Sequence, residues 1–235
     1  MKIKSVKCHL LTSDLAKRAF RWPGGSVRHW TTALVEVATD NGISGLGECY
    51  AGLGAPLPTR ALVEQFADLL IGQNPLDIPR LYHRMRSKCL FWGKAGLPLT
   101  VIGVIENALW DILGQAQGVP VWQLLGGKAH DALTAYASGG LDATPKDLTR
   151  ELEGYLKQGF HAVKIRIGHS LDQDIRKMRL ARRVLGDGVE LMVDAVMGHN
   201  PRPWSAKEAL RRAKTMEELA IAWFEEPCGN RDYEG

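Results

Sequence analysis

The segment HAVKIRIGHSLDQDIRKMRLARRVLGDGVELMVDA, residues 161–195, decides the predicted fold. Its two ends, 163–167 and 190–193, are short apolar runs typical of β-strands, and the stretch 172–185 between them has the apolar spacing of an amphipathic helix. A strand, a helix and a second strand in this order predict two parallel strands joined by a right-handed crossover.

The same alternation continues on both sides of this segment. Further strands are predicted at 133–137 and 221–224, and further helices at 144–158 and 205–219. Units of about thirty residues are typical of a (β/α) barrel, whose complete form has eight units. A doubly wound sheet is the competing architecture, but GHS after Ile167 is not a Gly-rich phosphate loop. We therefore predict the first four βα units, roughly, of a TIM-type barrel in residues 128–235.

Residues 1–127 have a different pattern, that of an α+β capping domain. Alternating apolar and polar residues predict three strands, the last two joined by an Asp-Asn-Gly turn, at 1–11, 31–38 and 43–48. Apolar residues three and four apart predict three helices packed on this sheet, at 59–71, 76–90 and 99–117. The stretch 20–29, rich in Trp, Gly and Arg, has no period and is predicted to be a mobile loop.

Composition and charge exclude several classes of protein. The formal charge is +4, but basic and acidic residues alternate along helical stretches such as 172–183, which favours solvated helix surface over a nucleic-acid interface. The cysteines have no CxxC spacing, so we expect neither a zinc site nor disulfides at Cys8, Cys49, Cys89 and Cys228. The N-terminus lacks a signal-peptide pattern, and no apolar run reaches membrane-spanning length. We expect a cytoplasmic protein with no membrane or nucleic-acid partner.

Polar residues stand at the end of each later strand, where the strands of a βα barrel converge on one mouth. Asp194 and Glu225 follow apolar runs on neighbouring predicted strands, and carboxylate oxygens are the ligands that Mg²⁺ prefers. Taken singly, Asp194 is equally well explained as a cap of the next helix, and Glu225-Glu226-Pro227 as an ordinary strand exit. Their recurrence on successive strands favours a metal site.

Two cations are predicted beside these carboxylates. Lys164 and Arg166 alternate with Val163, Ile165 and Ile167, which places both cations on one face of the strand. Because helices cover the outside of a barrel, the polar face must be the interior. Two cations beside two carboxylates indicate a site for an anionic substrate.

Several motifs together resemble one family. ALWDILGQAQGVPVWQLLGG at 108–127 resembles the passage from capping domain to barrel in the mandelate racemase and muconate lactonizing branch of the enolase superfamily. The other motifs follow in the family's order and spacing over the whole chain: GISGLGE at 42–48, KIR at 164–166, VDA at 193–195, WFEEP at 223–227 and DYEG at 232–235.

The resemblance implies a mechanism. Asp194 and Glu225 would be the first two Mg²⁺ ligands, and a small carboxylate substrate bound to the metal would lose the proton α to its carboxylate. The family's commonest motif on the second strand is Lys-x-Lys, whereas this chain has Arg166, a poor base and a good clamp for oxyanions. Lys164 would then orient the substrate carboxylate. Val196 stands where many relatives have Asn, so that polar contact is missing or comes from His199 or Asn200.

Substrate specificity in the family resides largely in two capping-domain loops, which correspond here to 20–29 and 48–58. Four aromatic or basic residues in them are candidates for binding a polyhydroxy acid: Trp22, Arg28, His29 and Tyr50. The alternative is that such side chains pack onto their own domain.

The resemblance also implies a third metal ligand and a His base, oriented by an Asp, on later strands. None of these strands is in the sequence, so we expect a fragment of a longer protein or a truncated gene product, inactive by itself. The resemblance further implies a homo-oligomer.

Three functions stay open on the sequence. Dehydration of an acid sugar is preferred. Arg166 stands where the family commonly has a second Lys that acts as a base, and a dehydration needs only one base, whereas a racemisation needs two. The second is a racemase or epimerase of a hydroxy or amino acid, in which Lys164 or even Arg166 acts as one of two catalytic bases. The third is a non-catalytic protein that binds a metal or an anion.

Overall fold

The computed structural model describes residues 1–15, 19–22, 25–141 and 143–235, with the backbone alone at Phe20 and Trp22. It divides into two compact units. The first contains the described residues of 1–18 and 28–131, and the second those of 19–27 and 132–235. This division differs from the predicted domains, 1–127 and 128–235, in grouping 19–27 with the second unit and 128–131 with the first.

The first unit is built on an antiparallel sheet in the order β1-β4-β5. The strands are β1 (Ile3–Asp14), β4 (His29–Thr39) and β5 (Ser44–Cys49), which confirms the three strands predicted from alternation. The turn between β4 and β5 needs a left-handed residue, supplied by Gly42 with φ of 90°. The Thr39 hydroxyl donates to the carbonyl of Ile43 across this turn.

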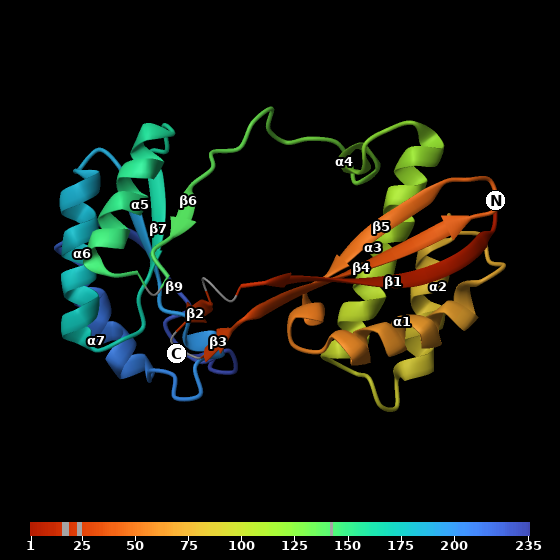
Figure 1. Cartoon of the computed structure of the whole chain (residues 1–235), viewed down its shortest axis with the longest axis horizontal. Coiled ribbons are helices and arrows are strands. Elements are labelled where there is room, and N and C mark those ends of the chain that lie inside the picture. The colour runs from red at the N-terminus through yellow and green to blue at the C-terminus, as the bar shows by residue number, and fades with distance from the viewer. Residues whose placement is uncertain (16–18, 23–24, 142) are drawn as a thin grey trace. The chain divides into compact units, whose positions relative to one another are not determined.

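Three helices lie on one side of this sheet (Figure 1). They are α1 (Pro56–Leu70), α2 (Ile78–Cys89) and α3 (Leu97–Gln117), each at its predicted place. Helices α1 and α3 contact the strands, and α2 packs against the other two helices. Strand β5 lies directly on α3, because a Cβ at Gly45 would overlap the carbonyl oxygen of Ala108 and a Cβ at Gly47 that of Val104. The glycines of GISGLGE therefore permit close packing of a strand on a helix.

Short helices stand at the edges of the first unit. The 3-10 helix η1 (Tyr50–Leu53) occupies part of the predicted specificity loop at 48–58. Helix α4 (Val121–Leu124) follows α3 after the left-handed Gly118.

Helix α3 corrects one expectation from the sequence. Its 21 residues are long and apolar enough to cross a membrane by length and composition, the one such helix among the described residues. Eight of its residues are buried, and most of them belong to the core of the first unit. Core helices commonly have this composition, since a helix that is apolar nearly all round can be buried in protein.

The prediction of a mobile loop at 20–29 is wrong where the structure describes it. The strands β2 (Phe20–Trp22) and β3 (Gly25–Val27) form an antiparallel pair, with Arg21 opposite Ser26. Strands of three residues are too short for an alternating pattern to emerge from the sequence.

The second unit is built on a parallel sheet in the order β6-β7-β8-β9. Its elements are β6 (Ala137–Gly139), α5 (Pro145–Lys157), β7 (Ala162–Arg166), α6 (Leu171–Leu185), β8 (Glu190–Asp194), the 3-10 helix η2 (Met197–His199), α7 (Ala206–Glu217) and β9 (Ile221–Glu225). Neighbouring strands follow chain order, without the reversal of a doubly wound sheet, as in the wall of a βα barrel. The first strand is shifted from 133–137 to Ala137–Gly139, and Leu133 is 83% exposed.

The helices α5, α6 and α7 lie on one side of this sheet (Figure 1). Each begins at a side-chain cap, from Thr144, Ser170 and Ser205 respectively. The apolar residues of β7 and β8 that face these helices, such as Ile165 and Val193, are fully buried. The other face carries Lys164 and Arg166 on β7 and, at the strand ends, Asp194 on β8 and Glu225 on β9.

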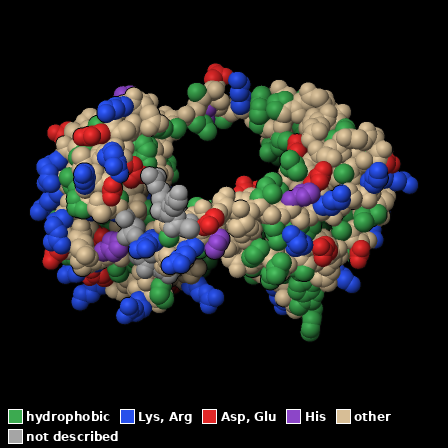
Figure 2. All heavy atoms as spheres, in the orientation of Figure 1, with side chains coloured by type: hydrophobic (Ala, Val, Ile, Leu, Met, Phe, Trp, Pro, Cys, Tyr) green, Lys and Arg blue, Asp and Glu red, His purple; other side chains and the backbone are tan. Residues whose placement is uncertain are grey.

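Charged side chains do not gather by sign on the face shown in Figure 2. Lys and Arg are spread over both units, with Asp and Glu among them.

Candidate functional site

The candidate site lies on the face of the parallel sheet opposite the helices. On β7, Val163 and Ile165 are buried in the core between sheet and helices, while Lys164 and Arg166 alternate with them. Lys164 is nevertheless only 6% exposed. The predicted division of β7 into an apolar and a cationic face is confirmed.

The two predicted metal ligands end neighbouring strands and are paired in register. Asp194 on β8 stands beside Glu225 on β9, and Arg166 stands beside Asp194 on the other side. The ammonium of Lys164 donates to Glu225 Oε1 at 2.7 Å and Oε2 at 2.6 Å and lies 3.9 Å from Asp194 Oδ2. We call Lys164, Arg166, Asp194 and Glu225 the strand-end cluster.

Arg166 connects this cluster to the first strand of the sheet. Its guanidinium donates to the Ser138 hydroxyl at 2.6 Å and to the Gly139 carbonyl at 3.4 Å. Its Nε lies 3.8 Å from Asp194 Oδ2. Arg166 thus lies between β6 and the carboxylate of β8.

The surroundings of Lys164 keep it charged. Burial lowers the pKa of Lys164, but hydrogen bonds and charge interactions with Glu225 and Tyr136 oppose this, and the net pKa is raised above the ordinary lysine value. The ammonium also lies 5.4 Å from the centre of the Tyr136 ring, which packs edge-on against Trp223. In this arrangement the charged form of Lys164 is favoured.

Glu226 points away from the strand-end cluster, although it follows Glu225 directly. Its φ of 47° turns the chain, and its carboxylate lies about 3.1 Å from where a Cβ at Gly198 would stand. His199 Nε2 is 3.9 Å from Glu226 Oε1. Of the two consecutive glutamates, only Glu225 joins Lys164.

Backbone hydrogen bonds hold the loop after β8 against the loop after β9. Ala195 N donates to the carbonyl of Glu225, and Met197 N donates to that of Glu226. Asp194 Oδ1 accepts from Val196 N at 2.9 Å, while α7 begins at Ser205. The next helix, η2, follows Val196 without a side-chain cap, and Ser205 caps α7, so the alternative that Asp194 caps the next helix is wrong.

The donor set suits a hard divalent cation in part. Asp194 and Glu225 present carboxylate oxygens, and the Lys164 ammonium already lies between them as a cation would. No group of three or more His, Cys, Asp and Glu side chains able to hold a metal occurs in the described part of the chain. The two carboxylates would therefore be part of a coordination shell.

The predicted substrate residues belong mostly to the first unit. Tyr50 is 71% exposed at the start of η1. His29 Nε2 lies 4.0 Å from Asp14 Oδ1, and Arg28 is exposed beside it. The side chain of Trp22 lies outside the described residues. The roles of these four residues stay predictions.

The two residues proposed to replace the missing Asn contact are also placed by the structure. His199 lies near Glu226, and the Asn200 side chain accepts from Arg202 N. Neither of these interactions involves Lys164, Asp194 or Glu225.

Sequence reasoning missed Tyr136 and Ser138. Ser138 stands beside Lys164 in the β6–β7 register, so it shares the face of the strand-end cluster. An alternation argument could have found Ser138 once β6 was placed at Ala137–Gly139 instead of 133–137. No pattern in the sequence pointed to Tyr136, which precedes the strand.

Two family models match the sequence, one over each part of the chain. Residues 9–126 match the family model described as mandelate racemase / muconate lactonizing enzyme, N-terminal domain, and residues 147–235 match the model described as enolase C-terminal domain-like. Together the two matches cover most of the chain.

Individual relatives have several activities. The chain is 34% identical over 233 residues to D-galactarolactone cycloisomerase from Agrobacterium fabrum, covering 97% of this chain and 59% of that relative. It is 31% identical over 206 residues to L-talarate/galactarate dehydratase from Salmonella typhimurium, covering 86% and 50%. The chain thus spans less than two thirds of the length of these curated relatives.

A solved structure extends the comparison to the fold. The dipeptide epimerase from Enterococcus faecalis, complexed with Mg and the dipeptide L-Leu-L-Tyr, is 25% identical with a TM-score of 0.84. The match covers 100% of this chain and 63% of that one.

Proposed function

The chain belongs to the mandelate racemase and muconate lactonizing enzyme family of the enolase superfamily, and from this premise we propose that the whole protein removes the proton α to the carboxylate of a small acid, with Mg²⁺ as cofactor. The preferred reaction is the dehydration of an acid sugar. These 235 residues would supply part of the active site and be inactive by themselves.

One observation carries this proposal. Asp194 and Glu225 are register partners at the ends of β8 and β9, with the Lys164 ammonium between them. Like charges so close repel unless a cation lies nearby, so this pair of carboxylates requires a positive charge. A substrate anion near the same place requires cations as well, and Lys164 and Arg166 supply them.

The chain's own residues would bind and orient the substrate. Arg166 cannot give up its proton at ordinary pH, so it would hold a carboxylate or hydroxyl oxygen and stabilise the negative charge that develops after proton removal. Lys164, protonated beside Glu225, would pair with the substrate carboxylate. The base would come from residues of the whole protein outside these 235.

Asp194 and Glu225 are the residues of this chain that would hold the cofactor, each through carboxylate oxygens. When bound, Mg²⁺ supplies Lewis-acid stabilisation of the negative charge on the substrate carboxylate. The remaining ligands would again come from outside the chain.

Dehydration is preferred over epimerisation for two reasons. Arg166 is a poor proton acceptor, so a reaction with bases on both faces of the substrate loses one of them here. Cycloisomerisation and dehydration of acid-sugar derivatives are also the activities named for two of the relatives. Racemisation or epimerisation of a hydroxy or amino acid is the second candidate, supported by the similarity to the dipeptide epimerase.

The test uses the whole protein and a set of acid sugars. With Mg²⁺ present, a 2-keto acid product from at least one acid sugar is expected, together with its loss after chelation. Exchange of the α hydrogen with solvent deuterium without any 2-keto product would favour the epimerase. Absence of both turnover and exchange, with Mg²⁺ binding retained, would favour a non-catalytic binding protein.

The cellular setting is proposed on the same basis. A reducing, cytoplasmic compartment is proposed from the sequence alone, in which the four cysteines lie far apart without CxxC spacing. A homo-oligomer is proposed from the family resemblance alone.

A further inference from the structure

A cavity of about 390 Å³ lies between α5 and α6 in the second unit. Its apolar wall is formed by Leu148 and Leu180, with Pro145 at the start of α5. Its polar wall is formed by His169, Arg176 and Lys177. None of these residues belongs to the strand-end cluster.

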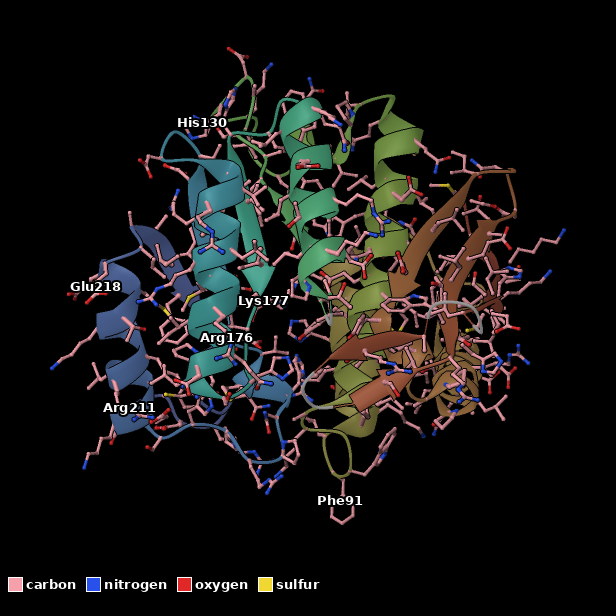
Figure 3. All side chains as sticks on the ribbon, turned by 60° about the vertical axis from the view of Figure 1, so that its left-hand side comes forward. Phe91, His130, Arg176, Lys177, Arg211 and Glu218 are labelled. Atoms are coloured by element: carbon pink, nitrogen blue, oxygen red, sulfur yellow. The ribbon has the colours of Figure 1, made fainter. Side chains whose placement is uncertain are left out.

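The polar wall carries positive charge. Figure 3 labels Arg176 and Lys177, which are consecutive residues of α6 and line the same cavity. Lys177 donates to the carbonyl of Gly140, at the end of β6. Arg176 is exposed and makes no hydrogen bond or ion pair with the residues that the structure describes. Its guanidinium is available to a ligand.

Two acidic groups on the helices beside the cavity, Asp174 on α6 and Asp147 on α5, are engaged elsewhere. The Asp174 carboxylate is buried and accepts from Gly168 N, His169 N and Arg212. Asp147, in the first turn of α5, pairs with Arg150. Neither carboxylate pairs with Arg176, and exposed Asp172, one turn earlier on α6, forms no ion pair with it in the described part of the chain.

The beginning of α5 adds to the positive field. Thr144 caps this helix and Pro145 is its first residue, so the N-terminal end of a 13-residue helix stands at the rim of the cavity. Helix N-termini carry a partial positive charge. The cavity therefore suits an anion with an apolar body. Arg176 and the N-terminus of α5 favour the negative charge, and the apolar wall favours the apolar body.

We propose that this cavity is a binding site for a small amphiphilic anion, with Arg176 as its main charged contact. The planar guanidinium suits the oxygens of a carboxylate or a phosphate ester. Leu148 and Leu180 contact the apolar body. A volume of about 390 Å³ lies in the range of small-molecule sites. The proposal is independent of the proposed catalytic function.

The test is an NMR titration of the purified protein with hexanoate, hexanol and inorganic phosphate. Saturable shifts of the amides around His169 and Arg176 are expected with hexanoate, and at least about fivefold weaker binding is expected with each of the other two probes. Hexanoate affinity should fall as salt rises, because screening weakens an exposed charge contact. Equal affinity for hexanol or phosphate, or no saturation with hexanoate, would overturn the proposal.

Two variants on one helix locate the contact. Arg176→Ala should weaken hexanoate binding by about tenfold or more. Arg183→Ala removes the same charge from an exposed position of α6 that does not line the cavity, and it should leave the affinity within about twofold. If both variants lost the same hexanoate affinity, the effect would come from the overall charge of the protein, and the proposed site at Arg176 would be contradicted. Both substitutions are at exposed positions, and a thermal melt checks that the fold is retained.

Discussion

The ammonium of Lys164 lies 2.6 Å and 2.7 Å from the two carboxylate oxygens of Glu225. A metal ion that binds Glu225 must share these oxygens with the ammonium or displace it. Lys164→Met removes the competitor and leaves both carboxylates in place. We expect Mg²⁺ to bind this variant about tenfold more tightly than the parent chain, measured by calorimetric titration at neutral pH.

Matched variants separate competition from general charge effects. Lys146→Met makes the same change at an exposed position of α5 and should leave Mg²⁺ affinity unchanged. Asp194→Asn and Glu225→Gln should each abolish measurable binding. Weaker Mg²⁺ binding by Lys164→Met would show instead that Lys164 organises the ligands.

The close contact of β5 with α3 predicts opposite effects of two Gly→Ala substitutions. At Gly45 a methyl group would overlap the Ala108 carbonyl, so Gly45→Ala should lower the free energy of unfolding by about 2 to 3 kcal/mol. At Gly103, inside α3, a Cβ meets nothing within 4 Å, so Gly103→Ala should raise it by about 0.5 to 1 kcal/mol. Urea denaturation measures both changes.

The change in unfolding free energy caused by Gly45→Ala tests whether β5 packs directly on α3. If Gly45→Ala were neutral, β5 would not lie on the backbone of α3. Gly47→Ala provides a repeat of the test, because its Cβ would overlap the Val104 carbonyl.

These glycines illustrate what the sequence alone could predict. The long periodic segments were placed correctly, since α3 and β4 contain enough residues for a period to be visible. The short strands β2 and β6 were missed or displaced, because three residues carry no period. The reason for glycine at 45 and 47 was hidden until β5 was seen against α3.

The candidate site was predictable to a similar degree. Alternation on β7 placed Lys164 and Arg166 on one face, which depends only on the geometry of a strand. The direct contact of Lys164 with Glu225 depends on the register of three strands. The contact of Lys164 with Tyr136 involves a residue that lies outside any strand. Such contacts join positions far apart in the sequence, and no local pattern encodes them.

The end of α7 predicts a stabilising substitution. Ala220 follows this helix with φ of 49°, a left-handed conformation that strains any residue with a Cβ. Ala220→Gly should therefore raise the free energy of unfolding by about 1 kcal/mol. Ala206→Gly, in the first turn of the same helix, should lower it by about 0.5 to 1 kcal/mol. A loss of stability at both positions would contradict the left-handed conformation of Ala220.

The last prediction concerns the buried pair of Asp174 and Arg212, which are 1% and 5% exposed. Arg212 donates to Asp174 from α7, and its guanidinium stacks on Trp204 at 3.7 Å. Arg212→Met would leave the Asp174 carboxylate buried with only backbone donors. We expect the free energy of unfolding at neutral pH to fall by about 3 to 5 kcal/mol, measured by urea denaturation.

The pH dependence of this loss tests its cause. Burial raises the pKa of Asp174 above its ordinary value of 3.8, while the His169 N–H, the Arg212 charge and the Gly168 N–H oppose the rise. Without Arg212 the pKa rises further. A carboxyl with a higher pKa in the folded than in the unfolded state loses stability as pH rises between the two values, and regains it as pH falls. The deficit of Arg212→Met should therefore be smaller at about pH 4 than at neutral pH.

Arg211→Met is the matched control for Arg212→Met, since Arg211 also binds Glu208 but is exposed to solvent. It should cause a much smaller loss, with no comparable recovery at low pH. The double variant Asp174→Asn with Arg212→Met should lose less stability at neutral pH than Arg212→Met alone, because no charge stays buried. If the deficit of Arg212→Met were the same at both pH values, lost packing on Trp204 would be its cause instead of the unpaired carboxylate.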